Sequence, residues 1–383
     1  MTPSPSDARP WPDFRFARNV VVKAALLFVA VNVLWALFDP LPLLGRVSAY
    51  NALLPGRERL PYGEDPGRAY NLSLFQLEAI FASHVLARPK PAGEYRVVLI
   101  GDSSVWGLLL RPEDTLAGNL NAAGLTLPDQ RTVRVYNLGY PIMSLAKDLL
   151  LLKAAMRYQP DMIVWLVTLE SFPYDKQLFP PLLQHNPGPV RELISMHRLR
   201  LNPNDPGFVE ASFWERTLVG RRRALADLLR LQLYGVMWAA TGVDQAYPET
   251  YAPRQEDFEA DVSFHDLQPP HLTEADLAFD ILSAGSEVAG ETPLLIVNEP
   301  IFVSQGKNSH IRYDFFYPRW AYDDYRVLLD EQSQRNHWNY LDLWQGVPSD
   351  EFTDSAVHLT PQGSALLAAQ VGRAILDLAK MGN

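Results

Sequence analysis

Five short apolar segments recur along the chain and predict buried β-strands, each bounded by Gly, Pro or polar residues. Helix-length segments separate the first three. Among them, residues 145–158 carry apolar side chains every three to four positions, as an amphipathic helix does. Strands that alternate with helices form a parallel sheet with helices on both faces. The predicted strands are residues 96–100, 133–137, 162–168, 294–298 and 338–341.

The alternating pattern ends in a helix with clear signals at its start. Thr360 is of a type that caps helices, and Pro361 fits the first turn. The segment SALLAAQVGRAILDLAK that follows carries an apolar stripe. We therefore expect an α/β domain over residues 96–383, built on a doubly wound, mainly parallel five-stranded sheet of the flavodoxin-like kind.

Two stretches depart from this alternation. Residues 171–274 are rich in Pro and Arg and contain helical pieces but no clear strand. We expect them to form a helical insertion packed over the C-terminal edge of the sheet. Residues 39–95 combine Pro- and Gly-rich turns with a helical pattern at 72–86, which predicts a linker and a helical segment before the first strand.

The longest apolar segment is VVVKAALLFVAVNVLWALF, residues 20–38, interrupted only by Lys23 and Asn32. As a helix it is about 28 Å long, close to the thickness of a bilayer's hydrocarbon core. Three interpretations are open: a single transmembrane anchor, a signal peptide cleaved near residue 49, or a buried core helix. The length favours the anchor.

Basic residues suggest an orientation for this anchor. Arg9, Arg15 and Arg18 precede it, which favours a cytoplasmic tail over residues 1–19. The domain that follows the anchor is then extracytoplasmic. The sequence thus predicts a single-pass protein of the cell membrane.

Overall composition narrows the chemistry. The 383 residues carry a net charge of −10 and no basic run, which argues against a nucleic-acid partner. The chain has no cysteine, so disulfides, thiolate catalysis and cysteine-ligated zinc are excluded.

The ends of the predicted strands carry the residues that a serine hydrolase needs. Gly101-Asp102-Ser103 follows the first strand, and Gly139 follows the second. Asp354 and His358 lie just before the final helix. In a doubly wound sheet these strand ends meet at one edge, where a serine, a histidine and an acid can assemble. The alternative is that Gly-Asp-Ser is only a turn.

These blocks, in this order over residues 96–380 apart from the insertion, resemble the SGNH (GDSL-type) hydrolase superfamily. The resemblance implies that Ser103 is the nucleophile and that its own N–H is one oxyanion donor. It implies that the Gly139 N–H is a second donor, that His358 is the general base, and that Asp354 orients His358. No metal or organic cofactor is implied.

Two features depart from the family pattern. The third strand ends with Thr168 and Glu170 where the family has Gly and an oxyanion-binding Asn, so Asn298 after the fourth strand becomes the candidate third donor. Asp354 lies four residues before the histidine, whereas the family mostly places its Asp three before. Residues expected to line the substrate cleft are Asp102, Ser104, Thr168 and Glu170.

The anchor adds a second resemblance, to membrane-tethered SGNH-like proteins that work with membrane O-acyltransferases on cell-surface polysaccharides. Together these resemblances imply a serine esterase or O-acyltransferase that acts on an acyl ester, of a cell-envelope carbohydrate, through an acyl-enzyme. The alternative is a catalytically weak SGNH-fold module that binds glycan or serves as the extracytoplasmic partner of a membrane O-acyltransferase.

Overall fold

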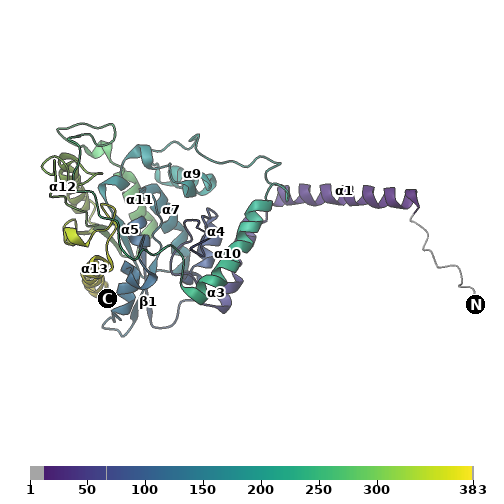
Figure 1. Ribbon diagram of the computed structural model, residues 1–383, viewed down its shortest axis with the longest axis horizontal. Coiled ribbons are helices and arrows are strands. Elements are labelled where there is room, and N and C mark those ends of the chain that lie inside the picture. The colour runs from purple at the N-terminus through teal and green to yellow at the C-terminus, as the bar shows by residue number, and fades with distance from the viewer. Residues whose placement is uncertain (1–12, 66, 382–383) are drawn as a thin grey trace, which may run out of the picture.

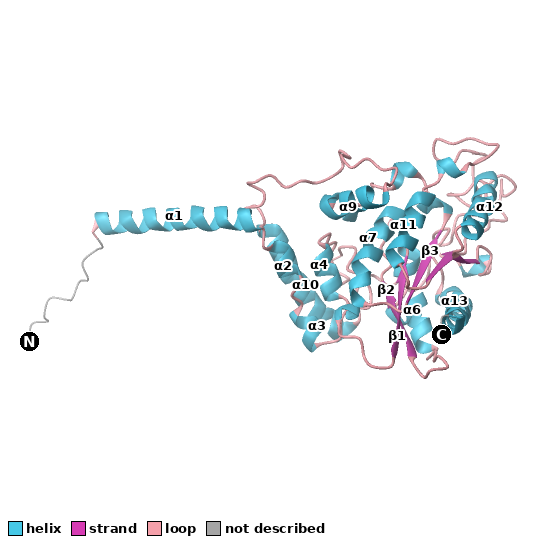
Figure 2. Ribbon diagram, turned by 180° about the vertical axis from the view of Figure 1, so that it is seen from behind, coloured by secondary structure: helices cyan, strands magenta, loops and turns pink. Residues whose placement is uncertain are grey.

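A five-stranded parallel sheet forms the centre of the molecule (Figure 2). The computed structural model describes residues 13–65 and 67–381. The strand order is β2-β1-β3-β4-β5, and every neighbouring pair is parallel. This is the flavodoxin-like order of doubly wound folds, which confirms the predicted fold class. The strands are β1 (Glu94–Ile100), β2 (Thr132–Asn137), β3 (Met162–Val167), β4 (Leu294–Asn298) and β5 (Asn339–Asp342).

The strand order reverses direction between β1 and β3. Leu99 lies opposite Val164 and Ile100 lies opposite Trp165, so these strands are direct neighbours. After β1 the chain moves outward to β2, and it then crosses back to β3 on the other side. In such sheets ligands bind in the crevice beyond the carboxyl ends of the two strands at this switch point. Ser103 follows β1 at this edge.

Helices cover both faces of the sheet, because successive strand side chains point to opposite faces. Val98 and Ile100 pack on one face, and Val97 and Leu99 pack on the other. The first face is covered by α7 (Leu145–Ala155) and α11 (Phe279–Ala289), and the second by α6 (Leu116–Ala122) and α13 (Pro361–Met381).

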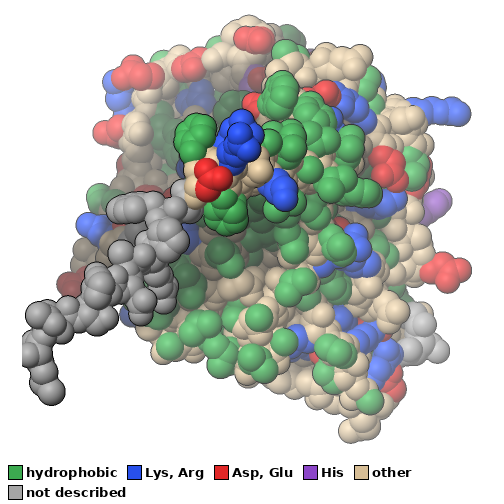
Figure 3. Space-filling model, turned by 90° about the vertical axis from the view of Figure 1, so that its right-hand side faces the viewer, with side chains coloured by type: hydrophobic (Ala, Val, Ile, Leu, Met, Phe, Trp, Pro, Cys, Tyr) green, Lys and Arg blue, Asp and Glu red, His purple; other side chains and the backbone are tan. Residues whose placement is uncertain are grey.

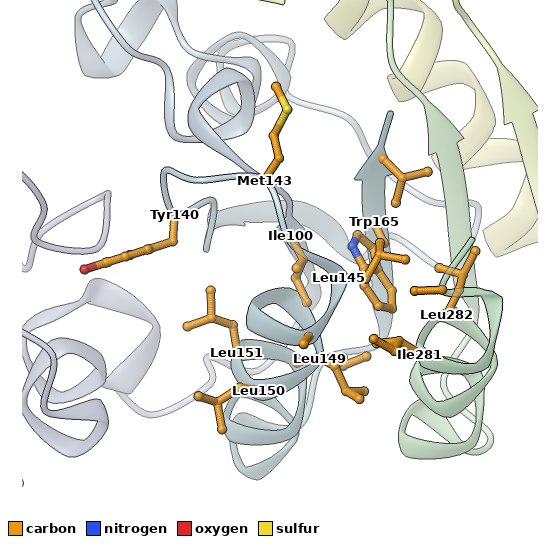
Figure 4. Packing of buried hydrophobic residues seen from close by; sticks show 14 of the residues in the cluster. Ile100, Tyr140, Met143, Leu145, Leu149, Leu150, Leu151, Trp165, Ile281 and Leu282 are labelled. Atoms are coloured by element: carbon orange, nitrogen blue, oxygen red, sulfur yellow. The ribbon is translucent and has the colours of Figure 1, made fainter. Parts of the chain in front are cut away.

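Trp165 of β3 is fully buried between the two helices of the first face (Figure 4). Leu145 and Leu149 of α7 lie on one side of its indole, and Ile281 and Leu282 of α11 lie near the other. This packing holds α7 against the sheet next to the end of β1.

The remaining helices lie around this framework (Figure 1). They are α2 (Leu41–Gly45), α3 (Ala49–Leu53), α4 (Leu77–Ser83), α5 (Ser103–Trp106), α8 (Pro181–Gln184), α9 (Pro187–His197), α10 (Arg222–Thr241) and α12 (Arg319–Arg335). Short 3₁₀ turns are η1 (Val85–Ala87), η2 (Pro112–Asp114), η3 (Met156–Tyr158), η4 (Leu169–Ser171), η5 (Tyr174–Lys176), η6 (Glu274–Asp276) and η7 (Ser349–Glu351). Of these, α8, α9 and α10 lie within residues 171–274, the region predicted to be a helical insertion.

The segment 39–95 is packed into the same core as the sheet, through buried residues that include Leu60, Phe81 and Leu86. Its helix is shorter than the predicted 72–86. The chain before Leu77 is held extended, because the Asn71 side chain accepts the Leu72 N–H (3.0 Å) and Asn186 donates to the Phe75 carbonyl (2.6 Å). These side-chain bonds compete with helix formation.

Arg59 links this N-terminal segment to the loop after α5. Its guanidinium donates to the carbonyls of Gly107 (2.8 Å) and Leu110 (3.0 Å) and lies over the Trp106 ring. The opposite edge of the guanidinium donates to Asp244 at 2.9 Å. Both partners of this ion pair are buried. Arg59 therefore ties the N-terminal segment, residues after α10 and the loop after α5 together.

The N-terminal helix α1 (Phe14–Phe38) projects away from the domain (Figures 1 and 2). It begins six residues before the predicted start, because Asp13 caps it by accepting the Arg15 N–H. Asn32 and Ala36 are its only buried residues, so the interpretation as a buried core helix is wrong. By length and composition α1 is a candidate membrane span or signal sequence. The first twelve residues of the predicted cytoplasmic tail lie outside the described residues.

Candidate active site

Ser103 begins α5, directly after the first strand. Asp102 caps this short helix, because its side chain accepts the Ser104 N–H at 2.7 Å. The Ser103 side chain is partly exposed, and its Oγ lies 2.8 Å from Nε2 of His358. The structure thus brings together two residues that are 255 positions apart in the chain.

His358 and Asp354 lie in one tight loop that follows β5. The loop is closed at its base by antiparallel pairing of Phe352 with Leu359, and the Thr353 N–H donates to the His358 carbonyl at 2.8 Å. Asp354 Oδ1 lies 3.3 Å from His358 Nδ1. The hydrogen bond with His358 lowers the pKa of Asp354. The loop therefore accommodates the four-residue spacing and gives a Ser–His–Asp sequence of contacts.

Replacing Asp354 with asparagine is expected to lower kcat for a simple ester by about 10- to 100-fold. The loss is smaller than the roughly 10⁴-fold seen when a buried triad acid is changed, because the Asp354 side chain is 41% exposed and its contact is long. Steady-state kinetics would measure this, with Asp350→Asn on nearby η7 as the control. An unchanged kcat would remove Asp354 from the site.

Gly139 lies after β2, pressed against the backbone of α5. A Cβ at this position would lie 2.3 Å from the Trp106 nitrogen and 2.7 Å from the Val105 carbonyl carbon. The Gly139 N–H donates to the side chain of Asn137 at 3.0 Å. The predicted role of this N–H as a free oxyanion donor therefore needs correction, because in this structure Asn137 occupies it.

Gly139→Ala is expected to destabilise the protein by about 1–3 kcal/mol, since a core position without space forces the backbone to shift. The shift would displace α5 and lower kcat as well. Denaturant unfolding and ester turnover measure the two effects. Gly188→Ala is the matched control, because a Cβ there meets no atom within 4 Å. Equal stability of the two variants would contradict the close approach.

Asn298 does not serve as the predicted third oxyanion donor. Its side-chain nitrogen donates to Asp342 at 2.9 Å, and its oxygen accepts from the Tyr325 hydroxyl at 3.1 Å. The residue is fully buried between β5 and α12. Both ends of its amide group are thus hydrogen-bonded to β5 and α12, and the group is not available to a substrate.

Thr168 and Glu170, which were expected to line the substrate cleft, also have partners. Thr168 Oγ1 lies 2.9 Å from the Tyr317 hydroxyl, and both residues are buried. Glu170 forms an ion pair with Lys176, and its second oxygen lies 3.2 Å from Nε2 of His265. Lys176 therefore compensates the charge of Glu170, and both carboxylate oxygens of Glu170 already have partners.

His265 is expected to stabilise the fold in a pH-dependent way. Its pKa is raised, chiefly by the hydrogen bond with Glu170. The contribution is then fully present below the ordinary histidine pKa of about 6.5 and is lost as pH rises through the raised value. Unfolding of wild type and His265→Ala at several pH values measures this. The difference between them should shrink from pH 6 to pH 9, and a constant difference would contradict the contact.

Of the three predicted oxyanion donors, the Ser103 N–H is the one that is not bound to another of the described residues. Within residues 13–65 and 67–381 this N–H has no hydrogen-bond acceptor. It belongs to the first residue of α5, where backbone N–H groups have no partner inside the helix. It is therefore available to a substrate oxygen.

A buried charged cluster of Lys147, Asp148 and Glu299 lies behind Ser103, and sequence reasoning did not predict Glu299. The Lys147 ammonium donates to the Gly101 carbonyl at 2.9 Å and lies 2.8 Å from Asp148. Burial raises the pKa of Asp148 to about 6. Burial and the nearby charge of Asp102 raise the pKa of Glu299, which accepts the Ser104 hydroxyl. A signal was present, since Lys147 and Asp148 lie among apolar residues in the first half of α7.

Comparison of the whole chain with known proteins gives similarity in structure only. No family model and no curated protein matches the sequence. A carbohydrate acetylesterase from Sinorhizobium meliloti is 12% identical, with a TM-score of 0.34, over 74% of this chain and 99% of its own. The aryl esterase of M. smegmatis is 12% identical, with a TM-score of 0.33, over 73% of this chain and 97% of its own.

A third solved structure, from Desulfitobacterium hafniense, is described as lipolytic and of the G-D-S-L family. It is 12% identical, with a TM-score of 0.34, over 73% of this chain and 99% of its own. At these TM-scores the similarity says nothing about activity. The activity proposed below therefore rests on the side chains of this chain.

Proposed function

We propose that the protein is a membrane-anchored serine esterase or O-acyltransferase of the SGNH type, acting on an acyl ester of a cell-envelope carbohydrate. The observation that carries the proposal is the 2.8 Å contact between Ser103 Oγ and His358 Nε2, continued by Asp354 at 3.3 Å from Nδ1. This is the order of contacts by which a histidine activates a serine.

In the proposed reaction Ser103 Oγ attacks the ester carbonyl carbon while His358 Nε2 takes the hydroxyl proton. The tetrahedral oxyanion accepts the Ser103 N–H. The bond to the leaving alcohol then breaks, and His358 returns the proton to that alcohol. In the second half, water or a carbohydrate hydroxyl gives its proton to His358 and attacks the carbonyl carbon of the acyl-serine. The bond between that carbon and Ser103 Oγ then breaks, His358 returns the proton to Oγ, and an acid or a new ester is released.

A second candidate function is supported by the shortage of free oxyanion donors among the predicted residues. The Gly139 N–H is bound to Asn137, and the Asn298 amide is bound to Asp342. Loss of one donor costs on the order of 3 kcal/mol of transition-state stabilisation. A site with one available donor fits a catalytically weak module that binds glycan or assists a membrane O-acyltransferase from the extracytoplasmic side.

Pre-steady-state hydrolysis of p-nitrophenyl acetate by the full chain in detergent separates the two candidates. A burst of p-nitrophenol that requires Ser103 and His358 indicates an acyl-enzyme. Adding a soluble carbohydrate polymer then distinguishes transfer from hydrolysis, because transfer releases more p-nitrophenol than acetate. Turnover no faster than that of Ser103→Ala would overturn the enzymatic proposal in favour of the binding module.

A further inference from the structure

The end of the domain from which α1 emerges presents exposed apolar side chains to the viewer in Figure 3. They come from α10, from the α2–α3 region and from the loop before α10. We call this set the α10 face. Its members are Leu43, Leu44, Val47, Leu53, Trp214, Val219, Leu229, Leu233, Val236 and Met237.

Helix α10 directs an apolar stripe outward. Leu229 and Leu233 are 68% and 65% exposed, and Val236 continues the same side of the helix. The opposite side carries the buried residues Leu231 and Trp238 and packs on the domain. A continuous apolar stripe on the surface marks an interaction site.

Helix α1 determines what this face meets. The Val219 N–H donates to the Asn32 side chain at 3.0 Å, and Arg221 lies 3.6 Å from Asp39. The loop before α10 is therefore fastened to the last two turns of α1. Figure 1 shows α10 running across the end of the domain at the base of α1.

The length of the apolar segment gives the depth of this contact. Residues 20–38 span about 28 Å, so a hydrocarbon core of about 30 Å needs the whole segment. The last part, from Asn32 to Phe38, already packs against the domain through Asn32 and Ala36. It corresponds to about 10 Å along the helix axis, which is the depth at which interfacial amphipathic helices lie.

We propose that the α10 face lies in the interfacial region of the lipid bilayer that α1 spans. This inference rests on the membrane anchor of the proposed function. Leu229, Leu233 and Val236 contact acyl chains, and the exposed Trp214 lies at headgroup level, where tryptophan is favoured. Arg222 and Arg223, exposed at the start of α10, face anionic headgroups. The domain is then held against the membrane in one orientation.

Site-directed spin labelling tests this directly, because the chain has no native cysteine. Leu233→Cys reports on the α10 face. Val327→Cys on α12 is the matched control, at 59% against 65% exposure, and lies on another part of the domain. Val29→Cys reports on α1 itself. The full chain is placed, one copy per lipid nanodisc, in phosphatidylcholine with phosphatidylglycerol.

Collision rates with oxygen, which partitions into lipid, and with a water-soluble nickel chelate give the environment of each label. We expect nickel collisions at residue 233 to be at least about fivefold slower than at residue 327, with oxygen collisions faster, as in an interfacial helix. Equal collision rates with the nickel chelate at residues 233 and 327 would overturn the proposal. Larger discs can hold two copies of the chain. Dipolar broadening between the two labels at residue 233 in such discs would indicate that the α10 face contacts a second copy, and it would also overturn the proposal.

The labels and the burst assay together separate the membrane contact of the α10 face from the membrane anchor and from the esterase activity. If the Val29 label is open to water, the anchor fails and the α10 face fails with it. If Val29 lies in lipid and Leu233 in water, the anchor stands and only the face fails. The burst of p-nitrophenol, measured on the same labelled variants, reads the esterase activity independently of both.

Discussion

Ser103→Ala is expected to lower kcat for p-nitrophenyl acetate by about 10⁴-fold or more and to abolish the burst. The variant keeps the fold, because Ser103 is partly exposed and, among the described residues, its hydroxyl has a hydrogen-bond partner only in His358. Without Oγ no acyl-serine forms, so the remaining rate reflects direct attack by water. Stopped-flow absorbance at the p-nitrophenolate wavelength measures both quantities.

Ser286→Ala on α11 is the matched control, since it removes a helical serine hydroxyl on a different element. It should keep the wild-type burst and kcat. Mass spectrometry adds a second readout, because the wild type quenched during turnover should carry one acetyl group on Ser103. An acetylated Ser103→Ala variant, or a burst that survives the substitution, would show that another residue is the nucleophile.

His358→Ala is expected to cost about as much as Ser103→Ala, because a serine hydroxyl without its base is a weak nucleophile at neutral pH. The two residues act as one unit through their 2.8 Å contact. The double variant should therefore lose little more activity than either single variant. Additive losses in the double variant would mean that the two side chains work independently and would contradict the shared mechanism.

Added imidazole provides a test of the role of His358 that a structural effect would not reproduce. An external base should partly restore turnover in His358→Ala and leave Ser103→Ala unaffected. His271→Ala, a strongly exposed histidine paired with Asp324, is the control and should behave as wild type. If imidazole restored turnover in both variants, His358 would not be the base. The same would follow if imidazole restored neither variant while His358→Ala still showed a burst of p-nitrophenol.

The contact between Ser103 and His358 could be predicted, because strand ends are readable from apolar segments. The carboxyl ends of parallel strands share one edge, so residues following β1 and β5 were expected to meet there. Ser103 and His358 do meet, despite their separation along the chain. The extra residue before His358 mattered little, because Phe352 and Leu359 pair and close the loop.

The oxyanion donors could not be predicted, because they depend on hydrogen-bond directions. Whether the Gly139 N–H is free depends on the rotamer of Asn137. Asn298 faces the same side of the sheet as Ile296, among the helices of the first face, because strand side chains alternate. The sequence did not show which face this is, because residues 294–297 are all apolar and β4 is buried on both faces. The buried Lys147–Asp148 pair needed the three-dimensional packing of α7 to be located.

The buried Arg59–Asp244 pair has a practical consequence for truncation. The sequence predicts a linker and a helical segment over residues 39–95, within which a chain could be cut to obtain a soluble domain. A chain cut at residue 60 would lose Arg59 and leave Asp244 buried without its guanidinium partner, a change that costs several kcal/mol. The carbonyls of Gly107 and Leu110 would lose their donor as well. A soluble version that preserves the loop after α5 should begin near Pro40, immediately after α1.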